Sequence, residues 1–274
     1  MRITAKPKSM VSDTANHNTA PLAAISSEGW VLFSGLLSDD LLHRLRSDLR
    51  TIYGERRAVQ ERNGIGDGME GTCHHLLGAN NAMDEFVASL PLHTFIHGFF
   101  NGPYILNSFG GFINEATASN GYIGAIHRDV RTFSRDFRLM LNMLVMLDDF
   151  TVENGATHLV SKSHNASEKP TTDAFQAAAI QATGVAGDIL MFDSRLWHAA
   201  GRNGTDMPRR ALTLTFTRPF FKPQLDYPRF LGDAYAAALP PQVRQVLGYD
   251  ARVPASIEEF YQPPERRAYK SDQG

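Results

Sequence analysis

Two residues in the stretch GAIHRDVRTF, Gly124 to Phe133, could bind one metal ion together. His127 and Asp129 are two positions apart, and on a β-strand such residues point to the same face. Composition alone predicts about one His-x-Asp/Glu pattern in a chain with 10 histidines and 29 acidic residues. The pair therefore needs a further ligand before it indicates a metal site.

His198 is the strongest candidate for that third ligand. It closes GDILMFDSRLWHAAGRN, in which a buried strand runs out into a turn that contains glycine. A sheet folded as a sandwich could bring this strand end beside His127. Two histidines and one carboxylate on one face of an ion form the ligand set of non-haem Fe(II) oxygenases. Such a set leaves adjacent positions open for a bidentate keto-acid and dioxygen.

Four further side chains are candidates for binding the keto-acid 2-oxoglutarate. Arg209 stands at the start of the alternating strand around ALTLTFT, and a guanidinium binds a carboxylate through two parallel hydrogen bonds. Arg210 should face the other side of that strand and ranks second. Asn107 and Asn142 lie on otherwise apolar strands, where an unpaired amide is costly. Each could bond to 2-oxoglutarate, to the shell of the active site, or to a neighbouring backbone.

The elements that must position these residues are helices first and short strands afterwards. A strand is expected at 29–33, a helix that follows the N-cap Ser38 and ends near Gly54, and a helix over 82–99 that bends near Pro91. Residues 55–81 are rich in Gly, Asn and charge and predict a long, lid-like excursion. Strands are expected at 104–113, 123–129, 139–147, 156–160, 188–192 and 211–217, and a helical tail around 229–247. This order indicates a mainly β fold, an antiparallel sandwich with flanking helices.

Composition narrows the class of protein further. A length of 274 residues with 43% hydrophobic content and a formal charge of −2 is typical of one globular domain, here 21–274 behind a flexible leader at 1–20. No apolar run reaches the length of a membrane helix, and no basic excess favours nucleic acid. Cys73 is the single cysteine, which excludes an internal disulfide and a Cys-rich zinc site and is typical of the cytoplasm. The oligomeric state stays open.

The chain resembles the phytanoyl-CoA dioxygenase family of Fe(II)/2-oxoglutarate-dependent oxygenases. The matching stretches occur in the family's order: EGWVLFSGLLSDDLLHRLR, HRD at 127–129, LDDFTVENGATHLVSKSH, and GDILMFDSRLWHAAGRN followed by PRRALTLTF. The resemblance implies a double-stranded β-helix core, that is, a cupin-like jelly-roll. It also implies that His127, Asp129 and His198 bind the metal and that Arg209 anchors 2-oxoglutarate. Because Asp129 is retained, the site resembles that of a hydroxylase rather than a halogenase.

The chain departs from the family's pattern in one turn. Family members usually carry Pro-Gly before the Ser-His of the central motif, whereas Ser161 and Lys162 occupy these places here. That turn is structural in the family, so the departure puts its local geometry in question rather than the chemistry.

The implied reaction uses Fe(II), 2-oxoglutarate and O2, releases succinate and CO2, and hydroxylates a small molecule. The same chemistry can end in desaturation, cyclisation or epimerisation, because the pose of the substrate decides the outcome. The alternative functions are a non-catalytic binding protein on the same barrel and a cupin-like metalloenzyme without a keto-acid.

Four arginines lie at or shortly after the ligand pair: Arg128, Arg131, Arg135 and Arg138. They form either a solvated face or the rim of the active-site opening, in which case they would favour an anionic substrate.

Overall fold

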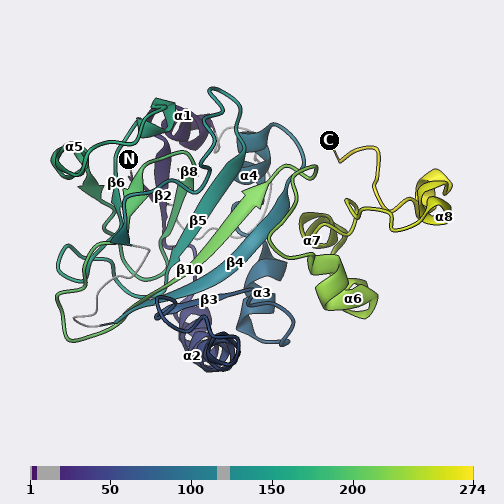
Figure 1. Ribbon diagram of the computed structural model, residues 1–274, viewed down its shortest axis with the longest axis horizontal. Helices are drawn as coiled ribbons and strands as arrows, with labels where there is room; N and C mark the ends of the chain where they lie inside the picture. The colour runs from purple at the N-terminus through teal and green to yellow at the C-terminus, as the bar shows by residue number, and fades with distance from the viewer. Residues whose placement is uncertain (1, 5–18, 116–123, 274) are drawn as a thin grey trace.

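The protein is built on two β-sheets with helices packed mainly against one of them (Figure 1). The computed structural model describes residues 2–4, 19–115 and 124–273. The strands are β1 (Arg2–Thr4), β2 (Trp30–Ser34), β3 (Thr72–His74), β4 (Ile105–Asn114), β5 (Met140–Met146), β6 (His158–Leu159), β7 (Ile180–Gln181), β8 (Ile189–Asp193), β9 (His198–Ala199) and β10 (Arg209–Thr217). The helices are α1 (Thr19–Glu28), α2 (Asp39–Arg62), α3 (Ala82–Ser89), α4 (His93–Phe100), α5 (Thr172–Ala178), α6 (Tyr227–Ala237), α7 (Pro241–Val246) and α8 (Ile257–Phe260).

The larger sheet has the order β1-β2-β8-β5-β10-β4-β3, and the smaller one has the order β7-β6-β9. Apart from the parallel pair β1 and β2, the described strands pair in an antiparallel manner. The crossovers between non-consecutive strands produce the expected jelly-roll, and the predicted fold class is confirmed.

Alternation along β5 shows how the sequence separates two cores. Leu141, Met143 and Val145 pack on the helical side, in one cluster with residues of α2 such as Leu45. The intervening Leu144 belongs to a second cluster on the inner face of the sheet. A strand that is buried on both faces needs apolar residues at nearly every position. Asn142 interrupts the inner face, and it does so at the functional site.

Helix α2 begins where predicted but continues past the predicted end. The Ser38 side chain accepts a hydrogen bond from the Leu41 amide, which confirms the N-cap. The end near Gly54 is wrong, because the helix runs to Arg62. A single glycine costs a helix only about 1 kcal/mol. Tertiary anchoring offsets that cost, since buried Gln60 donates to the Thr72 carbonyl at 3.1 Å.

The predicted excursion at 55–81 is therefore shorter than expected and is not a lid over its whole length. Its first part is helical, and Thr72–His74 form the edge strand β3, paired with β4. The bend near Pro91 is confirmed, because α3 ends at Ser89 and α4 starts at His93. The helical tail is confirmed as α6 and α7.

The strand expected at 123–129 is not formed by its described part. Residues 124–129 make one isolated bridge, between His127 and His198, and otherwise follow an irregular path. The expected flexible leader falls largely on residues 5–18, outside the described residues, and Arg2–Thr4 form strand β1. None of the described helices combines the length and the apolar composition needed to cross a bilayer.

The turn that departs from the family's Pro-Gly keeps a backbone shape that favours glycine. Lys162 has a φ of 67° and precedes the short 3-10 turn Ser163–Asn165. Left-handed backbone is uncommon for a residue with a side chain and costs roughly 1–2 kcal/mol. Tertiary hydrogen bonds support it: the Lys162 amide donates to the Glu28 carbonyl at 2.8 Å. Trp30 Nε1 donates to Ser161 Oγ at 2.8 Å, so the preceding residue is held as well.

Candidate metal centre and co-substrate site

Three side chains predicted as metal ligands meet at one point. His127 Nε2 lies 3.5 Å from Asp129 Oδ1, and His198 Nε2 lies 3.9 Å from Asp129 Oδ2. One donor atom from each residue lies within 4.8 Å of the other two. An ion with ligand bonds of about 2.0–2.2 Å can touch all three donors with small side-chain adjustments. The donor set of two imidazoles and one carboxylate fits Fe(II).

Backbone hydrogen bonds, rather than a common strand, bring the three ligands together. The His127 amide donates to the His198 carbonyl at 3.0 Å, and the His198 amide donates back at 2.9 Å. The Asp129 amide donates to the Ser194 carbonyl at 3.0 Å, just before β9. The irregular segment around His127 is thus fastened to the chain that leads into His198, although they are far apart in sequence.

Both imidazoles are oriented by carbonyl groups. His127 Nδ1 lies 2.7 Å from the Ala125 carbonyl, and His198 Nδ1 lies 2.9 Å from the Leu196 carbonyl. A carbonyl only accepts, so each Nδ1 carries a proton and each Nε2 is the ring nitrogen that remains for a metal ion. This is the usual arrangement behind a metal-binding histidine.

The charge states of His198 and Asp129 suit metal binding. Burial would lower the pKa of His127, but the contacts with Asp129 and the Ala125 carbonyl raise it, so a metal ion must displace a proton from this imidazole. Burial lowers the pKa of His198, which favours the neutral imidazole that a metal requires. Burial would raise the pKa of Asp129, but its contacts with His127, His198 and Asn142 hold the value at about 2. The carboxylate is therefore ionised at neutral pH. Its side chain is 32% exposed, because it opens into a cavity from which an ion can enter.

Asn142 supports the carboxylate ligand. Its Nδ2 donates to Asp129 Oδ2 at 2.5 Å, from the inner face of β5. The opposite amide orientation would place Oδ1 against a carboxylate, so the observed orientation is favoured electrostatically. Asn142 is 4% exposed and its Oδ1 has no hydrogen-bond partner among the described residues. The amide thus orients Asp129 and leaves one acceptor for a bound molecule or water in the cavity.

Replacing Asn142 by leucine is expected to weaken metal binding about 10- to 100-fold, as the loss of an outer-shell partner typically does. The reason is that Asp129 would lose the donor that fixes its carboxylate. Titration calorimetry with Ni(II) measures the affinity directly. Asn107→Leu is the matched control, because it removes a buried amide from a strand of the same sheet without touching Asp129. Equal Ni(II) affinities for the wild-type protein and Asn142→Leu would contradict the supporting role.

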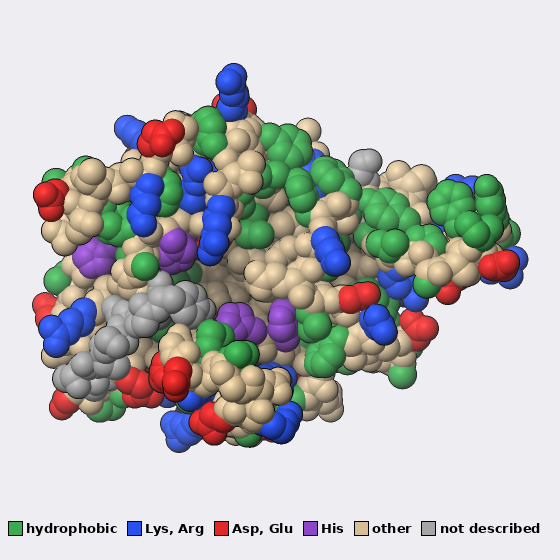
Figure 2. Space-filling model, in the orientation of Figure 1, with side chains coloured by type: hydrophobic (Ala, Val, Ile, Leu, Met, Phe, Trp, Pro, Cys, Tyr) green, Lys and Arg blue, Asp and Glu red, His purple; other side chains and the backbone are tan. Residues whose placement is uncertain are grey.

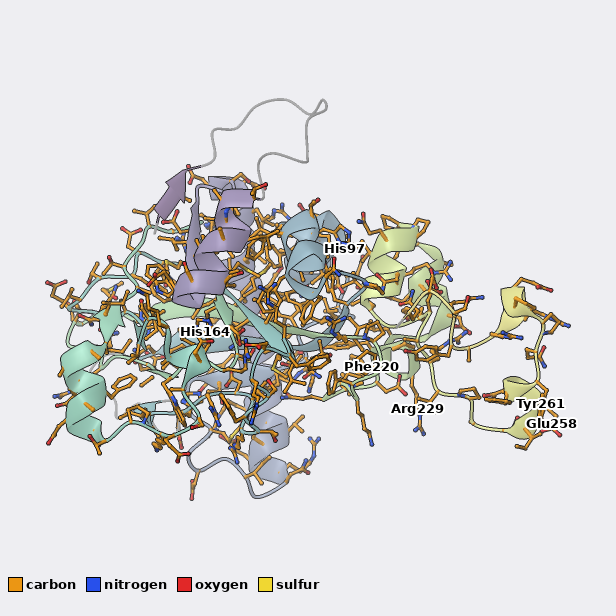
Figure 3. The ribbon with its side chains drawn as sticks, turned by 90° about the horizontal axis from the view of Figure 1, so that it is seen from above. His97, His164, Phe220, Arg229, Glu258 and Tyr261 are labelled. Carbon is orange, nitrogen blue, oxygen red and sulfur yellow. The ribbon has the colours of Figure 1, made fainter. Side chains whose placement is uncertain are left out.

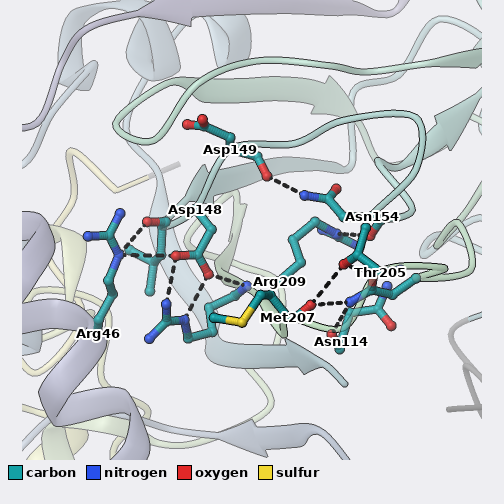
Figure 4. A network of polar contacts seen from close by, with 11 residues as sticks. Arg46, Asn114, Asp148, Asp149, Asn154, Thr205, Met207 and Arg209 are labelled. Carbon is teal, nitrogen blue, oxygen red and sulfur yellow. Dashed lines mark hydrogen bonds and ion pairs between the residues drawn. The ribbon is translucent and has the colours of Figure 1, made fainter. Parts of the chain in front are cut away.

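Arg209 is fully buried at the start of β10 and lines the same cavity. Figure 4 shows it within a network of polar contacts that includes Asn154. Its Nε donates to the Asn154 carbonyl at 3.0 Å, and its charge lies 4.0 Å from the centre of the Phe150 ring. Nη1 and Nη2 have no acceptor among the described residues. Burial lowers the pKa of Arg209 to about 10, so it remains charged at neutral pH. Two buried, unpaired guanidinium nitrogens are the donors that a carboxylate would satisfy.

Arg210 faces the opposite side of β10 and is already paired. Its Nε and Nη2 each lie 2.8 Å from an oxygen of Asp148, which also contacts Arg46 (Figure 4). The Nε and Nη2 donors of Arg210 are therefore already occupied by Asp148 and cannot bind a second carboxylate in the same way. Arg209 is therefore the better candidate for the co-substrate anchor.

One cavity of about 640 Å³ joins the metal ligands to Arg209, within the range typical of small-molecule sites. Figure 2 shows a hollow bordered by histidine side chains on one face of the molecule. Sequence reasoning missed Thr213 and Thr215, which line the cavity from β10. A signal was present, because they continue the period of two that starts at Arg209.

Asn107 and three histidines outside the ligand set differ in whether they reach the cavity. Asn107 does not line this cavity, and its Nδ2 donates to the Lys222 carbonyl at 3.3 Å, so only Asn142 is brought to the site. His164, labelled in Figure 3, is buried, and its Nε2 contacts the Ser26 carbonyl. It packs so closely on Gly29 that a Cβ there would lie 2.5 Å from its Nδ1. Of the two histidines in the expected lid, His74 lines the cavity, whereas His75 contacts Tyr227.

Comparison with known proteins identifies the family. The profile of the phytanoyl-CoA dioxygenase family matches residues 25–211, more than half of the chain. The chain belongs to the phytanoyl-CoA dioxygenase family. The resemblance predicted from the motifs is confirmed.

Individual relatives agree with this assignment. The uncharacterized protein Rv1501 of Mycobacterium tuberculosis is 39% identical over 171 residues, which cover 62% of this chain and 61% of that protein. The match thus spans about three fifths of that relative's length. Dioxygenase aneA of Aspergillus aculeatus is 26% identical over 239 residues, 81% of this chain and 80% of that protein. The crystal structure of EctD from S. alaskensis with bound Fe has a TM-score of 0.64 at 17% identity and covers 78% of this chain and 83% of EctD, a likeness of fold.

Proposed function

We propose that this member of the phytanoyl-CoA dioxygenase family is an Fe(II)- and 2-oxoglutarate-dependent dioxygenase that hydroxylates a small molecule. One observation carries the proposal: three metal donors and the unpaired, buried guanidinium of Arg209 open into a single cavity. The donors suit Fe(II), and the guanidinium suits the distal carboxylate of 2-oxoglutarate.

In this proposal, some residues bind the metal ion or 2-oxoglutarate and others orient the residues that bind them. When bound, Fe(II) and O2 supply the oxidising power that converts 2-oxoglutarate to succinate and CO2 and places one oxygen atom in a C–H bond of the substrate. His127 and His198 would bind the ion through Nε2, because the carbonyls of Ala125 and Leu196 hold a proton on each Nδ1. Asp129 contributes the negative charge, and Asn142 keeps its carboxylate oriented. Arg209 fixes the far end of 2-oxoglutarate, so that its keto-acid end faces the ligands.

The substrate in this proposal is a small molecule that carries negative charge. Among the described lining residues, Asp129 supplies the only carboxylate, whereas Arg128, Arg131 and Arg209 are cationic. One divalent ion and one dianionic 2-oxoglutarate cancel, so they leave this positive excess unchanged. A cavity lined by one sign of charge raises the local concentration of the opposite sign. A reducing compartment such as the cytoplasm is the proposed location, in keeping with the free, buried thiol of Cys73.

The test is the formation of succinate from 2-oxoglutarate by protein supplied with Fe(II), ascorbate and a broad panel of small molecules, in air and under nitrogen. Succinate should form in air, should depend on added Fe(II), and should be absent under nitrogen. Mass analysis of the consumed compound separates hydroxylation, a gain of one oxygen, from desaturation or cyclisation, a loss of two hydrogens, and from epimerisation at constant mass. No oxygen-dependent succinate with the whole panel would instead favour a binding protein or a metalloenzyme without a keto-acid.

A further inference from the structure

We infer that Arg131 selects the substrate by binding an acid group, a carboxylate or a phosphate, of a molecule that also has an apolar body. This inference rests on the proposed function and assigns the excess positive charge of the cavity to one residue. The sequence marks four arginines after the ligand pair as a potential rim, and the structure separates their roles.

Arg128 is a structural cation rather than a free one. It is 7% exposed, and its Nη1 and Nη2 donate to the carbonyls of Ala166 and Arg131 at 3.1 and 3.2 Å. Its guanidinium also lies 4.9 Å from the centre of the Trp197 ring. Trp197 precedes the ligand His198, so Arg128 fastens the segment that follows Asp129 to the metal end of the molecule.

Arg131 lies on the segment that Arg128 holds in place. The carbonyl of Arg131 accepts a hydrogen bond from Arg128, whereas the side chain of Arg131 is exposed and lines the cavity. No hydrogen bond or ion pair joins its guanidinium to another residue in the described part of the chain. Arg131 lines the same cavity as His127, Asp129 and His198, so an acid group bound to it would share that cavity with the metal ligands.

The other arginines of the group do not compete for this role. Arg138 turns away, since its Nη1 donates to the Phe99 carbonyl and its Nη2 to Ser26 Oγ. Arg135 is exposed but does not line the cavity. Arg209 faces 2-oxoglutarate in the proposed function. Among the described residues that line the cavity, Arg131 is therefore the arginine that remains available to a substrate.

The cavity that Arg131 lines also has an apolar wall. Met140 and Leu144 lie on the inner face of β5, and Phe192 lies beside Asn142 on β8. These side chains line the same cavity as Arg131, so one molecule can place its acid group on the guanidinium and its carbon skeleton on the sheet. Figure 2 shows that Lys and Arg side chains stand along one border of the hollow.

The test compares acids with uncharged analogues of the same shape. Octanoate and octanamide, 1-naphthoate and 1-naphthamide, and phenyl phosphate and phenol are titrated into protein loaded with Ni(II) and 2-oxoglutarate, which does not turn over. At least one acid should bind about tenfold or more tightly than its partner, the gain expected of a charge-assisted hydrogen bond. Arg131→Gln should remove that preference, while Arg135→Gln, a change of equal charge on the same segment, should keep it.

The binding of 2-oxoglutarate distinguishes a failure of the Arg131 inference from a failure of the proposed function. If Arg131→Gln binds 2-oxoglutarate normally but no acid is preferred by the wild type, the inference on Arg131 is wrong and the proposed function stands. A preference that survives Arg131→Gln would also overturn it. Failure of the wild type to bind 2-oxoglutarate at all would contradict the proposed function instead. The carboxylate and phosphate pairs together show which acid the site accepts.

Discussion

His198→Ala is expected to abolish the formation of succinate, with a loss larger than the roughly 10- to 100-fold that removal of an outer-shell partner causes. The reason is that His198 supplies one of the three donors and is buried where water replaces it poorly. Titration with Ni(II) should show a corresponding loss of metal affinity. The protein should still fold, because the neighbouring strands are held by apolar clusters that do not include this ring.

His43→Ala is the matched control for this change, because His43 is an exposed histidine on α2, away from the cavity. It should retain both Ni(II) binding and turnover. Circular dichroism of both variants establishes that the fold is intact. Turnover close to that of the wild type in folded His198→Ala would refute the assignment of the metal ligands.

Arg209→Ala is expected to weaken 2-oxoglutarate binding by about 2–5 kcal/mol, the cost of truncating one partner of a buried, hydrogen-bonded charge pair. The KM for 2-oxoglutarate, or its affinity for the Ni(II)-loaded protein, measures the effect. Arg209→Lys keeps the charge but loses the planar fork, so it should bind with an intermediate affinity. Metal affinity without 2-oxoglutarate should change little, since Arg209 does not contact the three ligands.

Arg210→Ala separates the anchor from its neighbour. Because Arg210 pairs with Asp148 outside the cavity, its loss should lower stability somewhat and leave 2-oxoglutarate binding unchanged. Weakened binding of 2-oxoglutarate by Arg210→Ala, together with normal binding by Arg209→Ala, would show that Arg210 is the anchor instead.

Local patterns in the sequence predicted local features of the structure correctly. The period of two in β10 places Arg209 and Arg210 on opposite faces, and the structure confirms that separation. Ser38 as an N-cap and the break near Pro91 are equally local, because a hydroxyl and a proline act on neighbouring backbone groups. The same locality explains the error at Gly54, where a weak helix breaker is outweighed by a contact of Gln60 with Thr72.

Ligand types and their order could be predicted, whereas the way they converge could not. The sequence suggested that His127 and Asp129 share a face of a strand, but they lie on an irregular segment. The bridge between His127 and His198 joins residues that are distant along the chain, and periodicity carries no information on such pairing.

By itself, the sequence determined the family, the jelly-roll class, the residue types that can hold a metal, and the placement of Arg209 and Arg210 on opposite faces of one strand. Each of these follows from local patterning and from motifs in a fixed order. Only the tertiary structure decided that Asn142 orients Asp129, that Asn107 lies apart, and that carbonyls hold Arg128 while Arg131 has no partner among the described residues. Apart from the carbonyl of Arg131, the partners cited here lie 13 to 115 residues away along the chain, so these contacts form only once the distant segments have packed.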